Sequence, residues 1–326
     1  MKAMAISEFG GPEVLKMVDL PVPEPGPGEV QIKVHFASVN PADWKCREGF
    51  LKQFFQYKFP FVIGFDAAGT VTKLGEGVTG FKVGDRVLTS SNQGMGENGS
   101  YAEYLKALTF NVCHIPAGVS DEQAATIPVA GGTAWGAVFE PGELKAGQTL
   151  LVNGGSSSCG IFAIQFAKMI GAKVAATCGP ANVEFVRGLG ADLVIDYRNQ
   201  NVLEAVARWA PGGVDLVVDA IGLGSLPADT AKVVKRGGRI VCIATLINDT
   251  EAYDKAVNEK HGVAVMTNMI SIERRPVHLA AAVEAVASGK VKTPPYEVMT
   301  LAEAPAAQEK VKAAHVRGKI LLKVAG

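Results

Sequence analysis

The chain has 326 residues, which is long enough for two domains that each bury a core of their own. Lys plus Arg and Asp plus Glu both number 32, so the net charge is zero at pH 7, and no basic block is present to neutralise phosphates. No apolar stretch is long enough to cross a membrane, and the first residues lack a signal-peptide pattern. With five cysteines and no CxxC spacing, we expect a cytoplasmic protein without nucleic-acid or membrane partners.

The first 120 residues predict a mainly β domain. Short strand-like runs lie there between turns rich in Gly and Pro. We expect strands at residues 29–38, 67–74, 86–90 and 100–105.

A different pattern begins after Gly147, where apolar β-branched runs alternate with helical stretches. Such near-continuous apolar strands are typical of a parallel sheet covered by helices on both faces, so a doubly wound α/β domain is expected. A helix at about 275–289 and a strand at 318–324 do not extend the alternation, and we expect them to return to the first domain. The expected parallel strands lie at residues 149–154, 173–178, 191–197, 214–220, 238–244 and 263–269.

A loop of small residues joins the first of these strands to an apolar helix. Residues without bulk allow backbone N–H groups to approach a pyrophosphate at a helix N-terminus, so this loop is a candidate dinucleotide-binding turn. A tight turn without a ligand is the alternative. The candidate cofactor-binding residues of the loop are Gly154, Gly155, Ser156, Ser157, Ser158, Cys159 and Gly160.

The end of the second parallel strand bears on which cofactor binds. An NAD site usually has an acidic residue there to bind the adenosine ribose, but this chain has Thr177, Gly179 and Asn182. The missing carboxylate removes a repulsion against a 2′-phosphate and favours NADPH over NADH. No Lys or Arg stands at this turn, and the nearest candidates are Tyr197 and Arg198 after the third strand.

Several motifs, in order along nearly the whole chain, resemble the zinc-independent quinone oxidoreductase group of the medium-chain dehydrogenase/reductase superfamily. This resemblance implies a GroES-like catalytic domain of β-barrel type, formed by residues 1–124 and 267–326, and a Rossmann domain at 125–266. It also implies that nicotinamide and substrate share the cleft between the domains, and that the protein is a homodimer. The motifs are ASVNPADWKCREG (37–49), FPFVIGFDAAGTV (59–71), GFKVGDRV (80–87), GSYAEY (99–104), PVAGGTAWGAVF (128–139), LGAD (189–192) and RGKILLKV (317–324).

Two departures from the group concern the glycine turn and the 2′-phosphate, because the Lys or Arg that often follows the second strand is missing, with Ala181 and Val183 there instead; the zinc ligands of the wider superfamily are missing as well. Ser157 stands where the group has the middle glycine of its turn, and its hydroxymethyl group either shifts the pyrophosphate or donates a hydrogen bond to it. In the motif that resembles the superfamily's GHE, Phe65 replaces the ligand histidine, and the position of the catalytic cysteine falls near Asn40. Residues 89–105 contain none of the four cysteines of a structural zinc lobe, so no metal is expected.

Without a metal, the cofactor carries the reaction and the protein supplies position and electrostatics. Hydride addition to a quinone or an α,β-unsaturated carbonyl accumulates charge on the acceptor oxygen, which needs hydrogen-bond donors. The resemblance places Asn40 at the active site, and its amide can donate without titrating; capping a turn before Pro41 is the alternative. Asp43 and Asp66 are candidate catalytic carboxylates, but both lie in motifs of the family, and we expect them to hold backbone N–H groups instead.

The resemblance places Thr133 beside the nicotinamide, where its hydroxyl could orient the ring; satisfying a buried carbonyl is the alternative. Ile221, after the fourth parallel strand, is also assigned to the cofactor site. An aromatic segment follows Asn40 and lines either an apolar substrate pocket or the core. Its members are Phe50, Phe54, Phe55, Tyr57, Phe59 and Phe61, of which Tyr57 has a hydroxyl that could reach the substrate oxygen and is the second catalytic candidate.

The sequence therefore predicts an NADPH-dependent, zinc-independent reductase of quinones or other activated acceptors. An enone, alkenal or enoyl-thioester reductase is an alternative within the enzymes. An NADPH-binding stress or regulatory protein without catalysis is an alternative from another class, which the serines in the glycine turn support.

Overall fold

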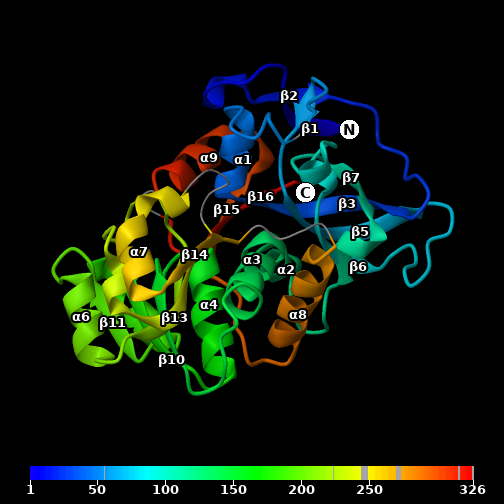
Figure 1. Ribbon diagram of the computed structural model, residues 1–326. Helices are drawn as coiled ribbons and strands as arrows, with labels where there is room; N and C mark the ends of the chain where they lie inside the picture. Colours follow the sequence, from blue (N-terminus) through cyan, green and yellow to red (C-terminus); the bar gives the residue numbers. More distant parts are fainter. Residues whose placement is uncertain (55, 223, 244–248, 269–272, 315, 325–326) are drawn as a thin grey trace. The chain divides into compact units, whose positions relative to one another are not determined.

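The computed structural model describes residues 1–54, 56–222, 224–243, 249–268, 273–314 and 316–324. Its contacts divide the chain into two compact units. Figure 1 labels many of their helices and strands. The first unit comprises Met1–Val129, Arg275–Val283 and Thr293–Gly326, and the second comprises Ala130–Arg274 and Glu284–Lys292. Segments from both ends of the chain thus fold together in the first unit.

Two β-sheets form most of the first unit. The larger sheet has the order β15-β16-β3-β5-β6-β8, with β7 also pairing with β3, and the smaller has the order β2-β1-β4. The strands are β1 (Lys2–Ile6), β2 (Lys16–Asp19), β3 (Glu29–Val39), β4 (Phe61–Val62), β5 (Asp66–Leu74), β6 (Arg86–Ser90), β7 (Tyr104–Leu108), β8 (Val112–His114), β15 (Tyr296–Thr300) and β16 (Lys319–Lys323). Strand β16 pairs with β3, so the C-terminal motif lies beside the strand that leads to Asn40.

Three short helices pack onto this unit, namely α1 (Pro41–Arg47), α2 (Asp121–Ala125) and α9 (Ala304–Lys312). Pro41 begins α1 at a position where its missing N–H costs nothing. Arg47 at the end of α1 is fully buried and donates to Gln308 at 3.0 Å and to Glu309 at 2.8 Å. Because both acceptors belong to α9, this guanidinium joins α1 to the C-terminal part of the chain.

The second unit is built on a parallel sheet with the order β11-β10-β9-β12-β13-β14. The first strand of the unit lies in the middle, and the chain winds outwards in both directions from it, which is the doubly wound Rossmann arrangement. The predicted doubly wound α/β domain is confirmed. The strands are β9 (Thr149–Asn153), β10 (Lys173–Cys178), β11 (Leu193–Asp196), β12 (Val214–Asp219), β13 (Val234–Cys242) and β14 (Ala264–Thr267).

Helices connect these strands and cover the sheet. Figure 1 shows α6 beside β11, the edge strand, with which it is in contact. Helix α4 packs on β9 and β10 through buried apolar residues that include Ile161, Phe162 and Phe166. The helices of this unit are α3 (Pro128–Phe139), α4 (Ser158–Met169), α5 (Val183–Gly188), α6 (Val202–Trp209) and α7 (Lys255–His261). Helix α8 (Arg275–Ala287) belongs to both units, with Arg275–Val283 in the first and the rest in the second.

Strand ends in the first unit differ from their predicted positions. The strand predicted at residues 100–105 begins only at Tyr104, because the preceding residues bond instead to the segment around Ile63 and Gly64. No helix in the described part of the chain is long and apolar enough to cross a membrane.

Candidate active site and dinucleotide-binding turn

The turn after β9 has a backbone that requires glycine at two positions. Gly154 has φ +85°, in the left-handed region that glycine adopts without strain, and a Cβ there would lie 2.5 Å from the side chain of Ile221. A Cβ on Gly160 would lie 2.1 Å from the carbonyl oxygen of Gly154. The start of α4 therefore packs directly against the turn, and this close approach is the geometry that a dinucleotide-binding turn needs.

Ser157 is the N-cap of α4. Its Oγ accepts a hydrogen bond from the N–H of Gly160 at 3.1 Å and donates one to the carbonyl oxygen of Gly154 at 2.8 Å. The only hydrogen of this hydroxyl is thus used inside the turn. Ser157 also has φ −72°, an ordinary value for a residue with a side chain, so no glycine is needed here. The hydroxyl of Ser157 therefore has no hydrogen left to donate to a pyrophosphate, which was one of the two roles considered for it.

A network of buried polar side chains forms hydrogen bonds to the turn and holds it in place. Thr177, which is 1% exposed, accepts from the N–H of Gly154 at 2.9 Å and donates to Asn153 at 2.7 Å. Asn153 donates to Asp219 at 2.8 Å, and Tyr253 donates to the other oxygen of Asp219, also at 2.8 Å. The hydroxyl of Thr177 thus holds the turn in place. Asn153, Asp219 and Tyr253 were not predicted from the sequence, because they lie far apart in the chain and give no local signal.

The other cofactor candidates of this unit lie around the end of β10. Asn182 donates to Ser156 at 3.3 Å and joins the two loops at the strand ends. Tyr197 is 53% exposed, and a Cβ on Gly179 would lie 3.9 Å from its hydroxyl. The neighbouring carboxylate, Asp196, accepts hydrogen bonds from the residues of its own turn.

The remaining cofactor-binding candidates are Ile221, which lies at the glycine turn, and Thr133, which lies on α3. Ile221 is 39% exposed and lies against Gly154, at the edge of the turn. Thr133 lies on α3, partly buried, and its carbonyl oxygen accepts from Asn268 at 2.9 Å.

In the first unit, sheet register brings Ser38, Asn40, Asp66 and Lys319 together into what we call the Asn40 cluster. Ser38 on β3 lies opposite Asp66 on β5, and β16 pairs with β3 on its other side. The ammonium of Lys319 donates to Ser38 Oγ at 3.1 Å, to Asp66 Oδ2 at 3.2 Å and to Asn40 Oδ1. Asn40 Nδ2 donates to Asp66 Oδ2 at 2.9 Å. No member of the cluster is more than 2% exposed.

A count of donors shows what the Asn40 cluster leaves unused. Lys319 has three N–H groups, and all three are used within the cluster. The hydroxyl of Ser38 donates to Asp66, whose second oxygen accepts from the N–H of Val129 at 2.9 Å. Asn40 Nδ2 has two N–H groups and gives one to Asp66. Among the described residues, the other N–H of Asn40 is therefore the one side-chain donor of the cluster that remains unused.

Asp43 and Asp66 both hold backbone N–H groups, as expected. Asp43 accepts from the N–H of Asn40 at 2.7 Å, from the N–H of Phe65 at 3.2 Å and from the hydroxyl of Tyr101 at 2.9 Å. Burial raises the pKa of Asp43 to about 7, against the opposing effect of the hydrogen bond from Asn40. Asn40 is the N-cap residue of α1, which is the alternative role considered for it, and its active-site role stays a prediction.

The aromatic segment after α1 is part core and part surface. Tyr57 packs edge to face on Phe9 and Phe61, with centroid distances of 5.0 and 4.7 Å. Its hydroxyl oxygen is buried. The pKa of Tyr57 lies above its ordinary value, mainly because of burial and to a smaller extent because of the neighbouring Cys46. Phe50, Phe54 and Phe59 are 47%, 46% and 43% exposed, Phe61 is buried, and Phe55 lies outside the described residues.

The residues at the Asn40 cluster do not fit a catalytic zinc ion. Asn40 stands there in place of a thiolate, and Phe65 in place of an imidazole. The ammonium of Lys319 already brings a positive charge to Asp66, and it would repel a second cation. Within the described ranges, no group of three His, Cys, Asp or Glu side chains is arranged to hold a metal.

Comparison with known families matches both units. Residues 26–117 match the alcohol dehydrogenase GroES-like domain, and residues 189–322 match the family described as zinc-binding dehydrogenase. The chain is 34% identical over 333 residues to the chloroplastic quinone oxidoreductase QR1 of Triphysaria versicolor, covering 99% of this chain and 98% of that protein. The chain belongs to the quinone oxidoreductases of the medium-chain dehydrogenase/reductase superfamily. The resemblance seen in the sequence is confirmed.

Other relatives differ in their activities. The chloroplastic NADPH-dependent alkenal/one oxidoreductase of Arabidopsis thaliana is 38% identical over 251 residues, which is 74% of this chain and 62% of that protein. The quinone oxidoreductase from Coxiella burnetii has a TM-score of 0.86 at 32% identity, with 100% and 99% of the two chains covered. An NAD-dependent alcohol dehydrogenase has a TM-score of 0.90 at 30% identity, with both chains fully covered. This oxidoreductase is therefore an enzyme of a family that binds a nicotinamide cofactor and a small-molecule substrate.

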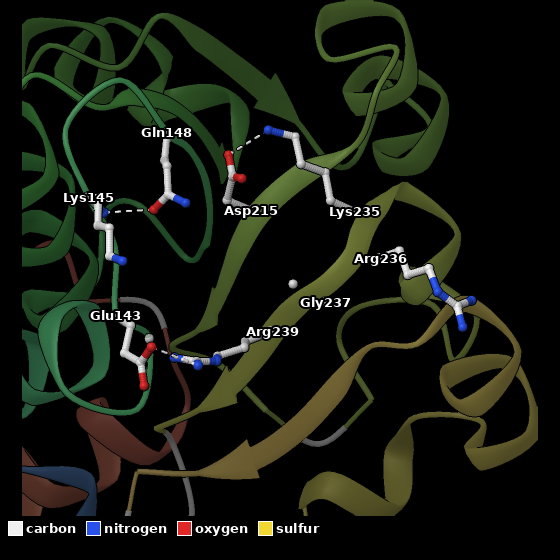
Figure 2. A pocket seen from close by; sticks show the side chains of 10 residues that line it. Glu143, Lys145, Gln148, Asp215, Lys235, Arg236, Gly237 and Arg239 are labelled. Carbon is white, nitrogen blue, oxygen red and sulfur yellow. Dashed lines mark hydrogen bonds and ion pairs between the residues drawn. The ribbon is translucent and has the colours of Figure 1, made fainter.

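A separate hollow lies at the opposite end of the parallel sheet from the dinucleotide turn, with a volume of about 270 Å³ (Figure 2). Four basic residues line it, but Asp215 binds Lys235 at 2.8 Å, and Glu143 binds Arg239 at 2.8 Å. Figure 2 shows that Arg236 extends away from the other labelled side chains. The carboxylates of the hollow thus compensate much of its positive charge.

Proposed function

We propose that this oxidoreductase transfers a hydride from NADPH to a quinone or another α,β-unsaturated carbonyl acceptor, without zinc. The observation that carries the proposal is the Asn40 cluster, which leaves one neutral N–H donor in a buried setting and offers no metal-binding set. A fixed amide donor suits a reaction in which charge develops on an acceptor oxygen. A zinc alcohol dehydrogenase would need thiolate and imidazole ligands here.

In the proposed mechanism, NADPH supplies a hydride to the electron-poor carbon of the acceptor when it is bound. The unused N–H of Asn40 donates a hydrogen bond to the acceptor oxygen, where negative charge accumulates. Its amide does not titrate, so this donor is present at every pH at which the protein is folded. Water then delivers the proton to that oxygen or to the neighbouring carbon. The glycine turn and Ser158 at the start of α4 would bind the pyrophosphate through backbone N–H groups.

The preference for NADPH is part of the proposal. It is supported by the absence of a carboxylate at the end of β10 and by the exposed Tyr197 and Arg198 one strand away. Arg198 can provide a charge-assisted hydrogen bond to a 2′-phosphate. One structural neighbour is an NAD-dependent alcohol dehydrogenase, so the ratio of kcat/KM for the two cofactors is the decisive quantity.

The experiment is a set of absorbance assays at the reduced-nicotinamide band. The purified protein receives NADPH or NADH and, in turn, 1,4-benzoquinone, 9,10-phenanthrenequinone, an alkenal and an enone. We expect quinone-dependent consumption that is faster with NADPH. Consumption with NADH alone would reject the cofactor assignment.

Alkene reduction is the second candidate, and the relative that acts on alkenals and enones favours it. Activity on the alkenal and the enone alone would establish it, and an enoyl thioester as a further acceptor tests the third candidate. Tight NADPH binding with no turnover of any acceptor would establish a binding protein instead.

We further propose a cytoplasmic homodimer. Sedimentation of the purified protein tests the dimer, and a monomer at micromolar concentration would reject it. The relative from Triphysaria versicolor is chloroplastic, so imaging of a tagged full-length chain in its own cells tests the location.

A further inference from the structure

We propose that Lys319 is a positioning residue that fixes the side-chain amide of Asn40 and thereby leaves it a single N–H for the substrate. This inference rests on the proposed function. It names Lys319 as the residue that holds the Asn40 N–H donor in place. Lys319 does not touch the substrate, because all three of its N–H groups are used within the Asn40 cluster.

The chemistry of the partners determines which way round the amide of Asn40 lies. An ammonium is only a donor, so the atom that faces Lys319 is the oxygen Oδ1. An ionised carboxylate is only an acceptor, so the atom that faces Asp66 is the nitrogen Nδ2. The flipped amide would place an N–H against the ammonium and an oxygen against the carboxylate, so the opposite orientation is doubly unfavourable.

Two anchors are needed to fix the plane of the amide as well as its orientation. A single bond from Nδ2 to Asp66 would leave the side chain free to rotate about that contact. The second bond, from Lys319 to the opposite end of the amide, removes this rotation and gives the remaining N–H one direction. A catalytic donor must be held in place before charge develops, because reorganisation during the reaction costs rate.

The position of Lys319 in the chain explains how it is held. It is the first residue of β16, and its side chain is 2% exposed. Ser38 on the neighbouring strand accepts a hydrogen bond from the ammonium and donates one to Asp66. The charges of Lys319 and Asp66 are thus paired, and Ser38 bridges them. Lys323, at the other end of β16, is exposed and provides a matched control.

The test is a double-mutant cycle on the full-length protein, with NADPH and 9,10-phenanthrenequinone as probes. We expect Asn40→Ala to lower kcat by about 100-fold, and Lys319→Met to lower it by about tenfold or more. Adding Lys319→Met to Asn40→Ala should then have no further effect, while Lys323→Met and the Kd for NADPH should stay unchanged. Losses that multiply in the double variant, or an unchanged kcat in Lys319→Met, would overturn the inference.

A second measurement follows the hydrogen exchange of the Asn40 side-chain amide and does not depend on enzyme activity. In protein labelled with ¹⁵N-asparagine, the NH₂ signal of Asn40, assigned by its loss in Asn40→Ala, should exchange slowly with water and exchange faster in Lys319→Met. Equal exchange would overturn the positioning role. If Asn40→Ala keeps full activity, the proposed function of Asn40 fails, while this measurement still decides whether Lys319 holds the amide.

Lys319→Met leaves the charge of Asp66 uncompensated, so it can prevent folding. The double variant Lys319→Met/Asp66→Asn removes both charges, and its amide oxygen can still accept from Asn40 Nδ2 at the cost of the bond from the N–H of Val129. We expect it to fold and to show the same loss of kcat, because Oδ1 still lacks its donor. Wild-type kcat in this variant would contradict the inference.

Discussion

Replacement of Ser157 by alanine tests the structure of the dinucleotide turn. The substitution removes the N-cap bond to Gly160 and the hydroxyl donation to Gly154. Loss of a serine N-cap costs about 1 kcal/mol, and a hydrogen bond has a net value of about 1 kcal/mol. The carbonyl oxygen of Gly154 keeps its bond from the N–H of Ser157 at 3.0 Å, so no acceptor is orphaned. The expected loss in the free energy of unfolding is therefore about 1–2 kcal/mol.

Thermal unfolding followed by circular dichroism measures this loss, which should lower Tm by about 3–6 °C in a domain of this size. Ser157→Gly should cost only a few tenths of a kcal/mol of capping energy, since glycine is tolerated at an N-cap. Ser158→Ala is the matched control, because no hydrogen bond of this hydroxyl exists within the described residues, and its Tm should stay within about 2 °C.

The same variants show whether Ser157 binds the cofactor. Because the hydroxyl hydrogen is used within the turn, the Kd for NADPH should change less than about threefold in Ser157→Ala, and a lost bond to a phosphate would raise it about tenfold or more. An unchanged Tm together with a tenfold weaker Kd would refute the reasoning.

Three further predictions concern other parts of the molecule. Partial burial raises the pKa of Asp215, but hydrogen bonds from Lys235 and Thr149 outweigh it and hold the pKa below its usual 3.8, so the group stabilises the fold above about pH 4. Asp215→Asn should therefore lower the free energy of unfolding at pH 7, with the difference shrinking as pH falls below 4; a constant difference would contradict this assignment. Tyr57→Phe should keep kcat within about threefold, because the hydroxyl is held beside the thiol of Cys46, and a fall of about 100-fold would make it a catalytic donor instead. Arg198→Ala should raise the KM for NADPH about tenfold and leave that for NADH unchanged, whereas equal effects would place the 2′-phosphate elsewhere.

The parallel sheet was predictable because its strands carry their own signal. Buried strands such as Leu150–Val152 within β9 are apolar on both faces, and the alternation with helices implies the doubly wound order. The short strands of the first unit were harder to predict. Strand β4 has two residues, and its pairing with β1 depends on chain segments that are far apart in the sequence.

The Asn40 cluster was only partly predictable. Asn40 and Asp66 are candidates from their motifs, whereas the motif that contains Lys319, at 317–324, does not indicate a role for it. Lys319 and Asn40 are 279 positions apart, and only the pairing of β16 with β3 brings them together. The role of Ser157 depended in the same way on geometry, since a serine in a glycine turn suits both a cap and a phosphate donor.

The central claim is that one fixed N–H of Asn40 stabilises charge on the acceptor oxygen during hydride transfer. Its most direct test is a single-turnover measurement of NADPH oxidation by 9,10-phenanthrenequinone in wild type and Asn40→Ala, with the Kd for NADPH measured in parallel. We predict a rate lower by about 100-fold in the variant at an unchanged Kd. Equal single-turnover rates would contradict the claim.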